Sequence, residues 1–239
     1  MQDSIHMNTQ VVILAGGMAT RLGSLTVSRP KSLLMIGDKP FLEHQINMLH
    51  TAGVRNILLC LGHLSEQIMD YFGDGKRLDV KITYNIEDKP LGTAGALKNA
   101  EKLLADTFMT LYGDSYLFLN LEDIMSRFVH SHKLGLMTVY RNFGLYDKSN
   151  TAIDNDGMVV RYDKQSKSGL EYIDYGLNVF RKQVLKWVPK DDYYPLEEVF
   201  HKLIEMRELI AFETKERFYE IGSPAGLTEF QKFVEGNKL

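Results

Sequence analysis

The chain has 239 residues, of which 44% are apolar and 25% are charged, and its formal net charge at pH 7 is -3. This length is enough for a full hydrophobic core, and the composition is ordinary for a soluble globular protein. The small net charge gives no reason to expect nucleic acid or an anionic membrane as a partner, so any phosphate binding must depend on local basic residues.

Two further features bound the cellular setting. No stretch reaches the ~18 apolar residues of a membrane span, and Met1–Gln10 has no apolar segment of the kind found in a secretion signal. The one cysteine, Cys60, excludes an intrachain disulfide, and its place in the apolar run Ile57–Leu61 favours a buried structural thiol over a nucleophile. We therefore expect a cytoplasmic protein with no membrane partner.

The first part of the chain alternates short strands and helices. In order, we expect a strand over Val11–Leu14, a glycine-containing loop, a helix after Pro40, a strand over Ile57–Leu61, a helix with Ser65 as its N-cap, and a strand over Val80–Ile86. This alternation is typical of right-handed βαβ crossovers. It predicts an α/β fold, a doubly wound, mostly parallel (Rossmann-like) three-layer sandwich.

A second glycine-containing segment follows, Glu87–Ala96, with a helix expected from Thr93. Phe108–Tyr112 is predicted to be a strand that leads directly into Gly113 and Asp114. Ligands of open α/β sheets bind at the carboxyl ends of the strands. Asp114 therefore lies where a ligand is expected.

The second half of the chain changes character. The turn Asn155-Asp156-Gly157 joins two short strands as a hairpin. The other expected elements are a helix over Leu121–His132, a strand over Leu136–Tyr140, a strand within Gly169–Phe180, a helix around Leu196–Ile204, strands over Leu209–Phe212 and Arg217–Ile221, and a helix that begins at Ser223–Pro224. No linker interrupts the chain, so we expect one domain over residues 1–239 whose second half is a mixed sheet extension.

The first strand ends in the loop Ala15-Gly16-Gly17-Met18-Ala19-Thr20-Arg21-Leu22. Glycines allow a sharp turn and let backbone N–H groups approach a ligand, and a guanidinium beside such donors is suited to phosphate oxygens. The dinucleotide pattern G-x-G-x-x-G is absent because the two glycines are adjacent, and no Lys-Ser/Thr pair of a Walker loop follows Gly23. An ordinary strand-to-loop turn is the alternative explanation of the glycines.

Together with Pro30-Lys31-Ser32, this loop resembles the signature of the sugar-1-phosphate nucleotidyltransferases, G-G-x-G-T-R-L followed by P-K-P. The resemblance extends from Val11 to about Phe230. The short chain is most similar to the D-glycero-D-manno-heptose 1-phosphate guanylyltransferase branch of that family. The chain departs from the family pattern at Ala19, which replaces a glycine, and at Ser32, which replaces a proline.

The resemblance implies an enzyme that makes an NDP-sugar and pyrophosphate from an NTP and a sugar 1-phosphate, for precursors of capsule, lipopolysaccharide or other cell-surface glycans. A sugar phosphate has a second pKa of ~6, so its oxygen is already largely ionised at pH 7 and needs no general base. The protein's tasks would be positioning and charge neutralisation. Residues about 8–118 would bind the nucleotide and about 119–239 the sugar phosphate. A homo-oligomer is left open.

The resemblance also assigns site residues one at a time. As catalytic residues, Arg21 and Lys31 would neutralise the leaving pyrophosphate. The residues expected to bind the nucleotide are Leu14, Ala15, Gly16, Gly17, Thr20, Glu87, Gly92 and Thr93. Those expected to bind the sugar phosphate are Asp114, Lys164, Asp174 and Gly176, of which Lys164 matches the lysine of the family's E-K-P motif.

The cofactor implied by the resemblance is Mg²⁺, which takes one or two carboxylates besides phosphate oxygens and water. In the family, the aspartates of a G-D motif and of a D-x-G-[TS] motif are the metal ligands. Here they correspond to Asp114 and, in Glu220-Ile221-Gly222-Ser223, to Glu220. Glutamate is an equally hard ligand but one methylene longer than aspartate.

Two other functions are weighed. A glycosyltransferase that uses a ready-made NDP-sugar would need a D-x-D metal motif, whereas this chain has Gly113-Asp114-Ser115. A non-catalytic regulatory subunit that binds sugar phosphates or nucleotides is favoured only by the departures at Ala19, Ser32 and Glu220. The pair Arg21 and Lys31, suited to pyrophosphate, also argues against the glycosyltransferase.

Overall fold

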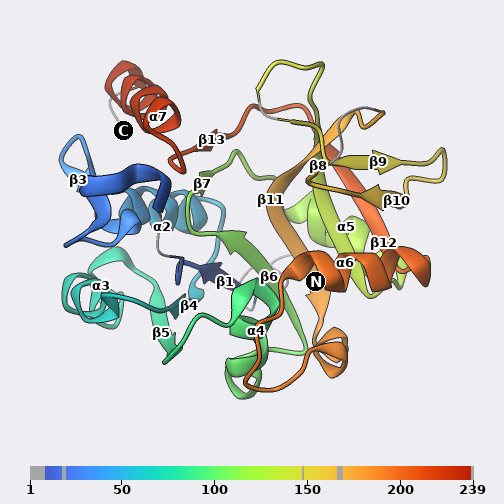
Figure 1. The fold of residues 1–239 in the computed structure, drawn as a ribbon, viewed down its shortest axis with the longest axis horizontal. Helices are drawn as coiled ribbons and strands as arrows, with labels where there is room; N and C mark the ends of the chain where they lie inside the picture. The colour runs from blue at the N-terminus through green and yellow to red at the C-terminus, as the bar shows by residue number, and fades with distance from the viewer. Residues whose placement is uncertain (1–8, 18–19, 147, 166–168, 238–239) are drawn as a thin grey trace. The chain divides into compact units, whose positions relative to one another are not determined.

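A computed structural model describes residues 9–17, 20–146, 148–165 and 169–237, without the side chains of Thr20, Arg21 and Ser24. The chain forms two compact units. Unit 1 comprises Met1–Pro90, Leu111–Leu119 and Phe218–Leu239, and unit 2 comprises Leu91–Thr110 and Asn120–Arg217. Each unit is thus assembled from segments that lie far apart in the sequence, as the colours of Figure 1 show.

The sheet of unit 1 is made of short, deeply buried strands. In the order β6-β1-β4-β5 it contains the end of β6 (Thr107–Tyr112), β1 (Gln10–Leu14), β4 (Asn56–Leu61) and β5 (Lys81–Ile86). β1 and β4 are parallel, with Gln10 opposite Asn56 and Leu14 opposite Cys60, and β5 continues the parallel pairing. Val11, Val12 and Ile13 have no exposed area, as expected for a strand covered on both faces.

Three helices and several short segments complete unit 1. They are α2 (Phe41–Thr51), α3 (Ser65–Phe72), α7 (Pro224–Asn237), η1 (Thr20–Thr26), η2 (Lys31–Leu33), η3 (Lys76–Leu78), β2 (Met35–Ile36), β3 (Lys39–Pro40), β7 (Ser115–Tyr116) and β13 (Tyr219–Glu220). The prediction that Ser65 is an N-cap is wrong, because Leu64 in the left-handed conformation precedes the helix and no side chain caps it. The strand expected over Arg217–Ile221 is limited to β13.

An aromatic cluster packs α7 against the short strands β7 and β13. The ring of Phe230, which has no exposed area, lies 5.2 Å from that of Phe41 and 4.9 Å from that of Tyr116, measured between centroids. Tyr219 and Phe233 stack on one another at 4.5 Å. The C-terminal helix begins where it was predicted to begin. These side-chain contacts explain how the two-residue strand β13, which Figure 1 shows near α7, keeps its place.

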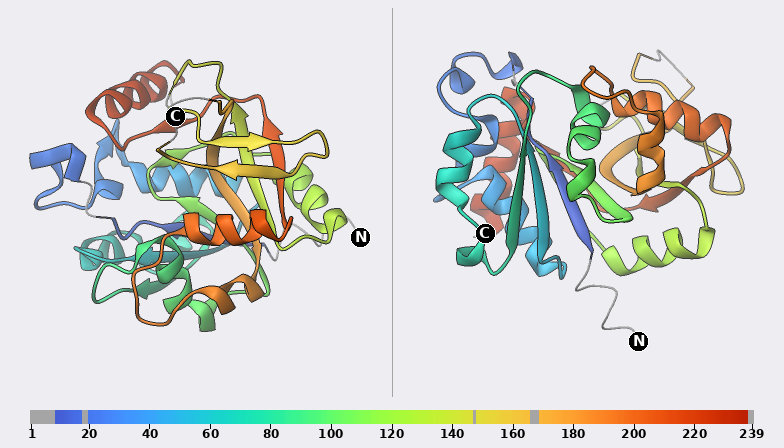
Figure 2. Two further views of the ribbon diagram at one scale, coloured as in Figure 1. Left: turned by 45° about the vertical axis from the view of Figure 1, so that its right-hand side comes forward. Right: turned by 90° about the horizontal axis from the view of Figure 1, so that it is seen from below.

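Unit 2 contains a sheet of mixed direction. Its strands are β8 (Gly135–Arg141), β9 (Thr151–Ile153), β10 (Val159–Tyr162), β11 (Tyr172–Arg181) and β12 (Leu209–Thr214), with the start of β6 beside β11. β11 is antiparallel to β8, whereas β12 is parallel to β8. β9 and β10 form the predicted hairpin, which Figure 2 shows as two neighbouring yellow arrows.

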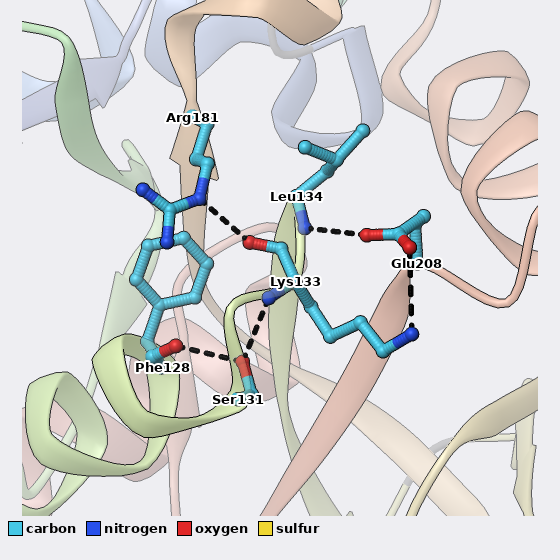
Figure 3. A network of polar contacts seen from close by, with 6 residues as sticks. All are labelled: Phe128, Ser131, Lys133, Leu134, Arg181 and Glu208. Atoms are coloured by element: carbon cyan, nitrogen blue, oxygen red, sulfur yellow. Dashed lines mark hydrogen bonds and ion pairs between the residues drawn. The ribbon is translucent and has the colours of Figure 1, made fainter.

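The helices of unit 2 are α4 (Gly92–Asn99), α5 (Leu121–Ser131) and α6 (Leu196–Glu205), with the short segments η4 (Glu101–Leu103) and η5 (Lys182–Trp187). A polar network joins α5 to the strands (Figure 3). Glu208 accepts hydrogen bonds from Lys133 Nζ at 3.4 Å and Leu134 N at 3.1 Å, and Arg181 Nε donates to the Lys133 carbonyl at 3.0 Å. The same guanidinium lies 5.2 Å from the ring centroid of Phe128.

These elements confirm the predicted fold class, a mostly parallel α/β sheet with flanking helices and a mixed extension in the second half. Within the described ranges, every helix is too short or too polar to cross a membrane.

Candidate active site

The loop after β1 is fixed to β4 and then passes close to Glu87. Ala15 N donates to the Cys60 carbonyl at 2.9 Å, which continues the β1–β4 pairing by one step. A Cβ at Gly16 would lie only 2.8 Å from Glu87 Oε1, so the close approach of this carboxylate requires a glycine. At Gly17 a Cβ would meet only open space, which is consistent with a loop face that could accept a ligand.

Gly62 is a site residue that the sequence analysis did not single out. A Cβ at Gly62 would lie 2.9 Å from the Gly16 carbonyl and 3.2 Å from Glu87 Oε1. The register of the two strands places Gly62 opposite Gly16, two steps beyond the Leu14–Cys60 pair. The sequence contains an indication of this neighbour, because a glycine follows each of the two buried strands at equivalent register positions. Glu87 itself is anchored by its N–H, which donates to the Leu61 carbonyl at 2.9 Å.

Cys60 is the buried structural thiol that its apolar surroundings predict. It is 2% exposed, and burial raises its pKa to about 12, with the charge of Glu87 adding to the effect. A thiol with this pKa is almost wholly protonated at neutral pH and is therefore a poor nucleophile.

The phosphate loop itself is only partly described. Met18 and Ala19 lie outside the described residues. The backbone of Thr20 and Arg21 begins η1, and their side chains also lie outside the described part. The predicted contacts of Arg21 with pyrophosphate, and the effect of Ala19 on the loop, therefore stay predictions.

The structure brings Lys31 and Asp114 together from positions 83 residues apart. Lys31 Nζ lies 2.6 Å from Asp114 Oδ2, and the two side chains are 18% and 24% exposed. Lys31 begins η2, and Asp114 lies in the turn between β6 and β7. A cation and a carboxylate that both keep some access to solvent can each be approached by a charged ligand.

Gly113 explains why this turn lies against the phosphate loop. Its N–H donates to the Leu14 carbonyl at 3.0 Å, and a Cβ here would lie 2.7 Å from the same oxygen and 2.9 Å from Ala15 Cα. Only glycine permits this approach. The predicted residues Leu14, Ala15 and Asp114 therefore belong to one small region of unit 1.

Glu220 reaches the same region through β13. In the antiparallel pairing of β13 and β7, Glu220 lies opposite Ser115, and the next residue, Ile221, donates its N–H to the Asp114 carbonyl at 2.9 Å. The backbones of Asp114 and Glu220 are thus one register step apart. Gly226 of α7 packs against the Glu220 carbonyl so closely that a Cβ there would overlap the oxygen. The Glu220 side chain is exposed.

The two carboxylates fit a magnesium site of the nucleotide type. Among the side chains that the structure describes, no three or more of His, Cys, Asp and Glu gather into a group that could hold a metal ion. Mg²⁺ at nucleotide sites is usually held by one or two protein carboxylates, with phosphate oxygens and water as the other ligands. Asp114 and Glu220 supply hard oxygen donors of this kind on adjacent backbone segments.

In unit 2, the N-terminus of α4 is occupied by the chain itself. The Tyr194 carbonyl accepts the N–H groups of Ala94 and Gly95, both at 2.9 Å, and Thr93 Oγ1 accepts the Leu196 N–H at 2.8 Å. Gly92 has a φ of +71°, and a Cβ there would lie 2.9 Å from the Tyr194 carbonyl oxygen. The glycine of this segment is therefore needed for packing within the chain. The prediction that Gly92 and Thr93 bind nucleotide is not tested by this geometry.

Of the residues predicted to bind the sugar phosphate, Asp114 lies in unit 1, whereas Asp174 and Gly176 lie on β11 and Lys164 follows β10. Asp174 is 7% exposed and accepts the Gly176 N–H on Oδ1 at 3.1 Å, and its own N–H donates to Asn150 Oδ1 at 2.9 Å. The β11–β8 register shifts between Asp174 and Asn178, and Gly176 lies in this bulge with a φ of +106°. Lys164 is exposed, with Nζ 5.8 Å from the ring centroid of Tyr162.

Gln45 is a second residue whose role the sequence analysis missed. Its Nε2 donates to the Tyr112 carbonyl at 2.9 Å and to the Ser115 carbonyl at 2.7 Å, on either side of Asp114. In the sequence it lies at helical spacing between the apolar residues Leu42 and Leu49, which predicts that it faces the core. The signal was its polarity, because a buried amide must find partners.

Comparison with known proteins gives the family. The model of the nucleotidyl transferase family matches residues 10–237. The chain is 30% identical over 224 residues to D-glycero-alpha-D-manno-heptose 1-phosphate guanylyltransferase of Campylobacter jejuni, which covers 92% of this chain and 98% of that protein. The crystal structure of HddC from Yersinia pseudotuberculosis complexed with GMP-PN is 28% identical, covers 95% of this chain and 99% of that one, and has a TM-score of 0.79.

A solved structure from Bacillus anthracis is similar in fold, with a TM-score of 0.83 at 18% identity over 95% of each chain. The match of the family model over nearly the whole chain decides the assignment. The chain belongs to the nucleotidyl transferase family, which confirms the predicted sugar-1-phosphate nucleotidyltransferase.

Proposed function

We propose that the chain transfers the guanylyl group of GTP to a heptose 1-phosphate and releases pyrophosphate. The observation that carries the proposal is the similarity, over 98% of its length, to the Campylobacter jejuni heptose 1-phosphate guanylyltransferase, at nearly the same size. The complex of the similar HddC with GMP-PN supports a guanine nucleotide as the donor. The product would be a GDP-heptose, which fits the expected role in cell-surface glycan precursors.

The position of Glu87 favours guanine on chemical grounds. Guanine carries two adjacent donors on its Watson–Crick edge, N1–H and the N2 amino group, and a carboxylate can accept both. Glu87 lies beside Gly16 and Gly62 at the ends of two neighbouring strands, where the absence of side chains leaves room for its carboxylate. We infer that the base contacts Glu87, and that Gly16, Gly17 and the backbone from Leu14 to Thr20 contact the ribose and phosphates.

The proposed chemistry is an in-line displacement on the α-phosphorus. An oxygen of the sugar phosphate forms the new P–O bond, and the bond between the α-phosphorus and the bridging oxygen breaks, so that pyrophosphate leaves with its electron pair. Lys31 and Arg21 would neutralise the charge that develops on this leaving group. In the structure Lys31 and Asp114 neutralise one another, so binding of a triphosphate would give each of them a new partner.

Asp114 and Glu220 would hold Mg²⁺, which supplies charge neutralisation at the phosphate oxygens when it is bound. The cytoplasm is the expected place of reaction, because it supplies both GTP and sugar phosphates.

For the sugar phosphate we propose Lys164 as the residue that binds the phosphate and Asp174 as an acceptor for sugar hydroxyl groups. In the bulge at Gly176, the Gly176 N–H donates a hydrogen bond to the Asp174 carboxylate. This fixed position of the carboxylate supports the proposed role of Asp174. Gly92 and Thr93 would contribute backbone contacts to the nucleotide.

The test is a panel of GTP, ATP, CTP, UTP and dTTP against heptose, mannose and glucose 1-phosphates, with pyrophosphate release and product mass as readouts. Turnover of GTP with a heptose 1-phosphate above every other pair is expected. Preference for mannose 1-phosphate or for another base would replace the proposed substrates within the same reaction. Binding of substrates without pyrophosphate release would favour a regulatory subunit, and consumption of NDP-sugar alone would favour a glycosyltransferase.

A further inference from the structure

The buried side chain of Gln45 holds the turn that carries Asp114 by hydrogen bonds. Both hydrogen bonds of the Gln45 amide nitrogen go to this turn, one to Tyr112 at the end of β6 and one to Ser115 at the start of β7. Gln45 has no exposed area, so water cannot replace it. The two accepting carbonyls enclose the turn Gly113–Asp114 from either side.

A third carbonyl of this segment is also held. The Asp114 carbonyl accepts the Ile221 N–H from the segment after β13. With Gln45 on one side and Ile221 on the other, the backbone of Asp114 has little freedom to shift. The backbone from which its carboxylate extends is therefore held in part by α2, the helix that carries Gln45.

The same helix also orients the partner of Asp114. η2, which begins with Lys31, packs against α2, and the first residue of that helix, Phe41, donates its N–H to the Leu34 carbonyl at 2.9 Å. Figure 1 shows α2 beside β7 in unit 1. One helix thus contacts both η2, which begins with Lys31, and β7, which follows Asp114.

Some buried polar side-chain atoms of unit 1 have no hydrogen-bond partner in the described part of the chain. In the described part of the chain, Gln45 Oε1, Ser32 Oγ and Ser115 Oγ are buried without a hydrogen-bond partner. Each such atom costs free energy of folding. An apolar side chain at position 45 would avoid the unpaired acceptor, but it would remove the hydrogen bonds to the Tyr112 and Ser115 carbonyls.

We propose that Gln45 is a positioning residue that holds the Asp114 carboxylate in the geometry needed for the divalent metal of the reaction. The inference depends on the proposed role of Asp114 as a metal ligand. Gln45 does not touch the metal or the substrates, and it acts through the backbone on either side of Asp114. Mutation of residues that orient a metal ligand by hydrogen bonds, without binding the metal, typically changes metal affinity by about 10- to 100-fold.

The experiment measures the binding of Mn²⁺ to the full chain at saturating GTP without sugar phosphate, by the relaxation enhancement of water protons. Gln45→Met keeps the volume of the side chain and removes both donors. It is expected to raise the Kd of Mn²⁺ by about 10-fold or more, and to raise the Mg²⁺ concentration at half-maximal activity by the same factor. The kcat at saturating Mg²⁺ should remain close to that of the wild type.

Glu43→Gln is the matched control. Glu43 lies on the same helix and is 5% exposed, but its carboxylate binds Arg77 and Tyr71 and does not contact the turn. It is expected to lower the Tm without changing the Kd of Mn²⁺. Gln45→Asn keeps the amide but is too short to reach both carbonyls, so it should fold readily and give an intermediate Kd.

The outcomes separate this inference from the proposed function. A folded Gln45→Met variant with the Mn²⁺ affinity of the wild type would overturn the inference. An equal loss of Mn²⁺ affinity in Gln45→Met and Glu43→Gln, at the same Tm in both variants, would overturn it too. If Gln45→Met does not fold, a Gln45→Asn variant with unchanged affinity overturns it. Asp114→Asn tests the metal assignment itself, because an unchanged Kd in that variant would remove Asp114 as a ligand and leave the proposal for Gln45 without a basis.

Discussion

Replacement of Glu87 by glutamine tests the proposed recognition of guanine at a single atom. The substitution keeps the shape of the side chain against Gly16 and Gly62, where Oε1 lies 2.8 Å and 3.2 Å from the positions of a Cβ. It also leaves the hydrogen bond from the Glu87 N–H to the Leu61 carbonyl in place. What changes is the charge and one acceptor, which becomes an N–H₂ donor that faces the donors of guanine.

The size of the effect follows from the strength of hydrogen bonds to charged groups, about 1.5–3 kcal/mol each. Inosine triphosphate lacks only the N2 amino group of GTP, so the wild type should prefer GTP over ITP by this amount, or about 10- to 150-fold in kcat/KM. In Glu87→Gln the preference for GTP over ITP should fall to within a few-fold, because the carboxylate that accepts a hydrogen bond from the N2 amino group is no longer present. The kcat/KM for GTP itself should fall by about 10- to 150-fold or more.

The assay is steady-state pyrophosphate release with GTP and ITP at saturating sugar phosphate. Asp88→Asn is the matched control, because it removes an exposed carboxylate from the adjacent position and should change neither ratio. A folded Glu87→Gln variant that keeps the GTP preference of the wild type would refute the reasoning, since guanine would then be recognised elsewhere.

Three other perturbations have equally definite outcomes. Arg21→Ala should lower kcat/KM by about 100-fold or more with an unchanged circular dichroism spectrum, since one transition-state charge contact is worth about 2.7–4 kcal/mol; near-normal turnover would remove Arg21 from the mechanism. Gly226→Ala should lower the Tm and weaken Mn²⁺ binding, because its Cβ would overlap the Glu220 carbonyl, whereas Gly236→Ala on the same helix meets open space and should be neutral or stabilising. Burial raises the pKa of Glu43, but hydrogen bonds from Arg77 and Tyr71 and the charge of Arg77 outweigh it and hold the pKa below its ordinary value of 4.5. The extra stability of the wild type over Glu43→Gln in urea unfolding should therefore be full above about pH 5 and disappear as the pH falls through the lowered pKa, and a difference that does not change with pH would contradict this.

The sequence predicts most of unit 1 because its signals are local. A run such as Val11–Leu14 can only be a buried strand, and adjacent glycines at its end can only turn. The register between strands is not local, and it is the register that places Gly62 opposite Gly16. Once β1 and β4 are known to pair, their register shows that Gly62 lies opposite Gly16. The periodicity of either strand alone does not show this.

The resemblance assigned Lys31 to pyrophosphate and Asp114 to a metal, and it indicated neither their ion pair nor the reason for their approach. The approach depends on Gly113, which abuts Leu14, and on Gln45, which holds the turn from α2. Helical spacing shows only that Gln45 faces the core. It does not show which backbone carbonyls will lie there, because these come from a strand and turn more than 60 residues away.

Gly92 shows how a matched motif can have two causes at once. Its positive φ and its contact with the Tyr194 carbonyl make glycine necessary for packing, whatever ligand the segment binds. The same holds at Gly113, where a side chain would collide with the Leu14 carbonyl before it could reach any substrate. At both positions the absence of a side chain allows two segments of the chain to pack closely. The ligand-binding surface is then formed by the residues that this packing places side by side. A substitution at either glycine would therefore be expected to lower stability and activity together, whereas one at Gly17, where a side chain meets open space, would change ligand binding alone.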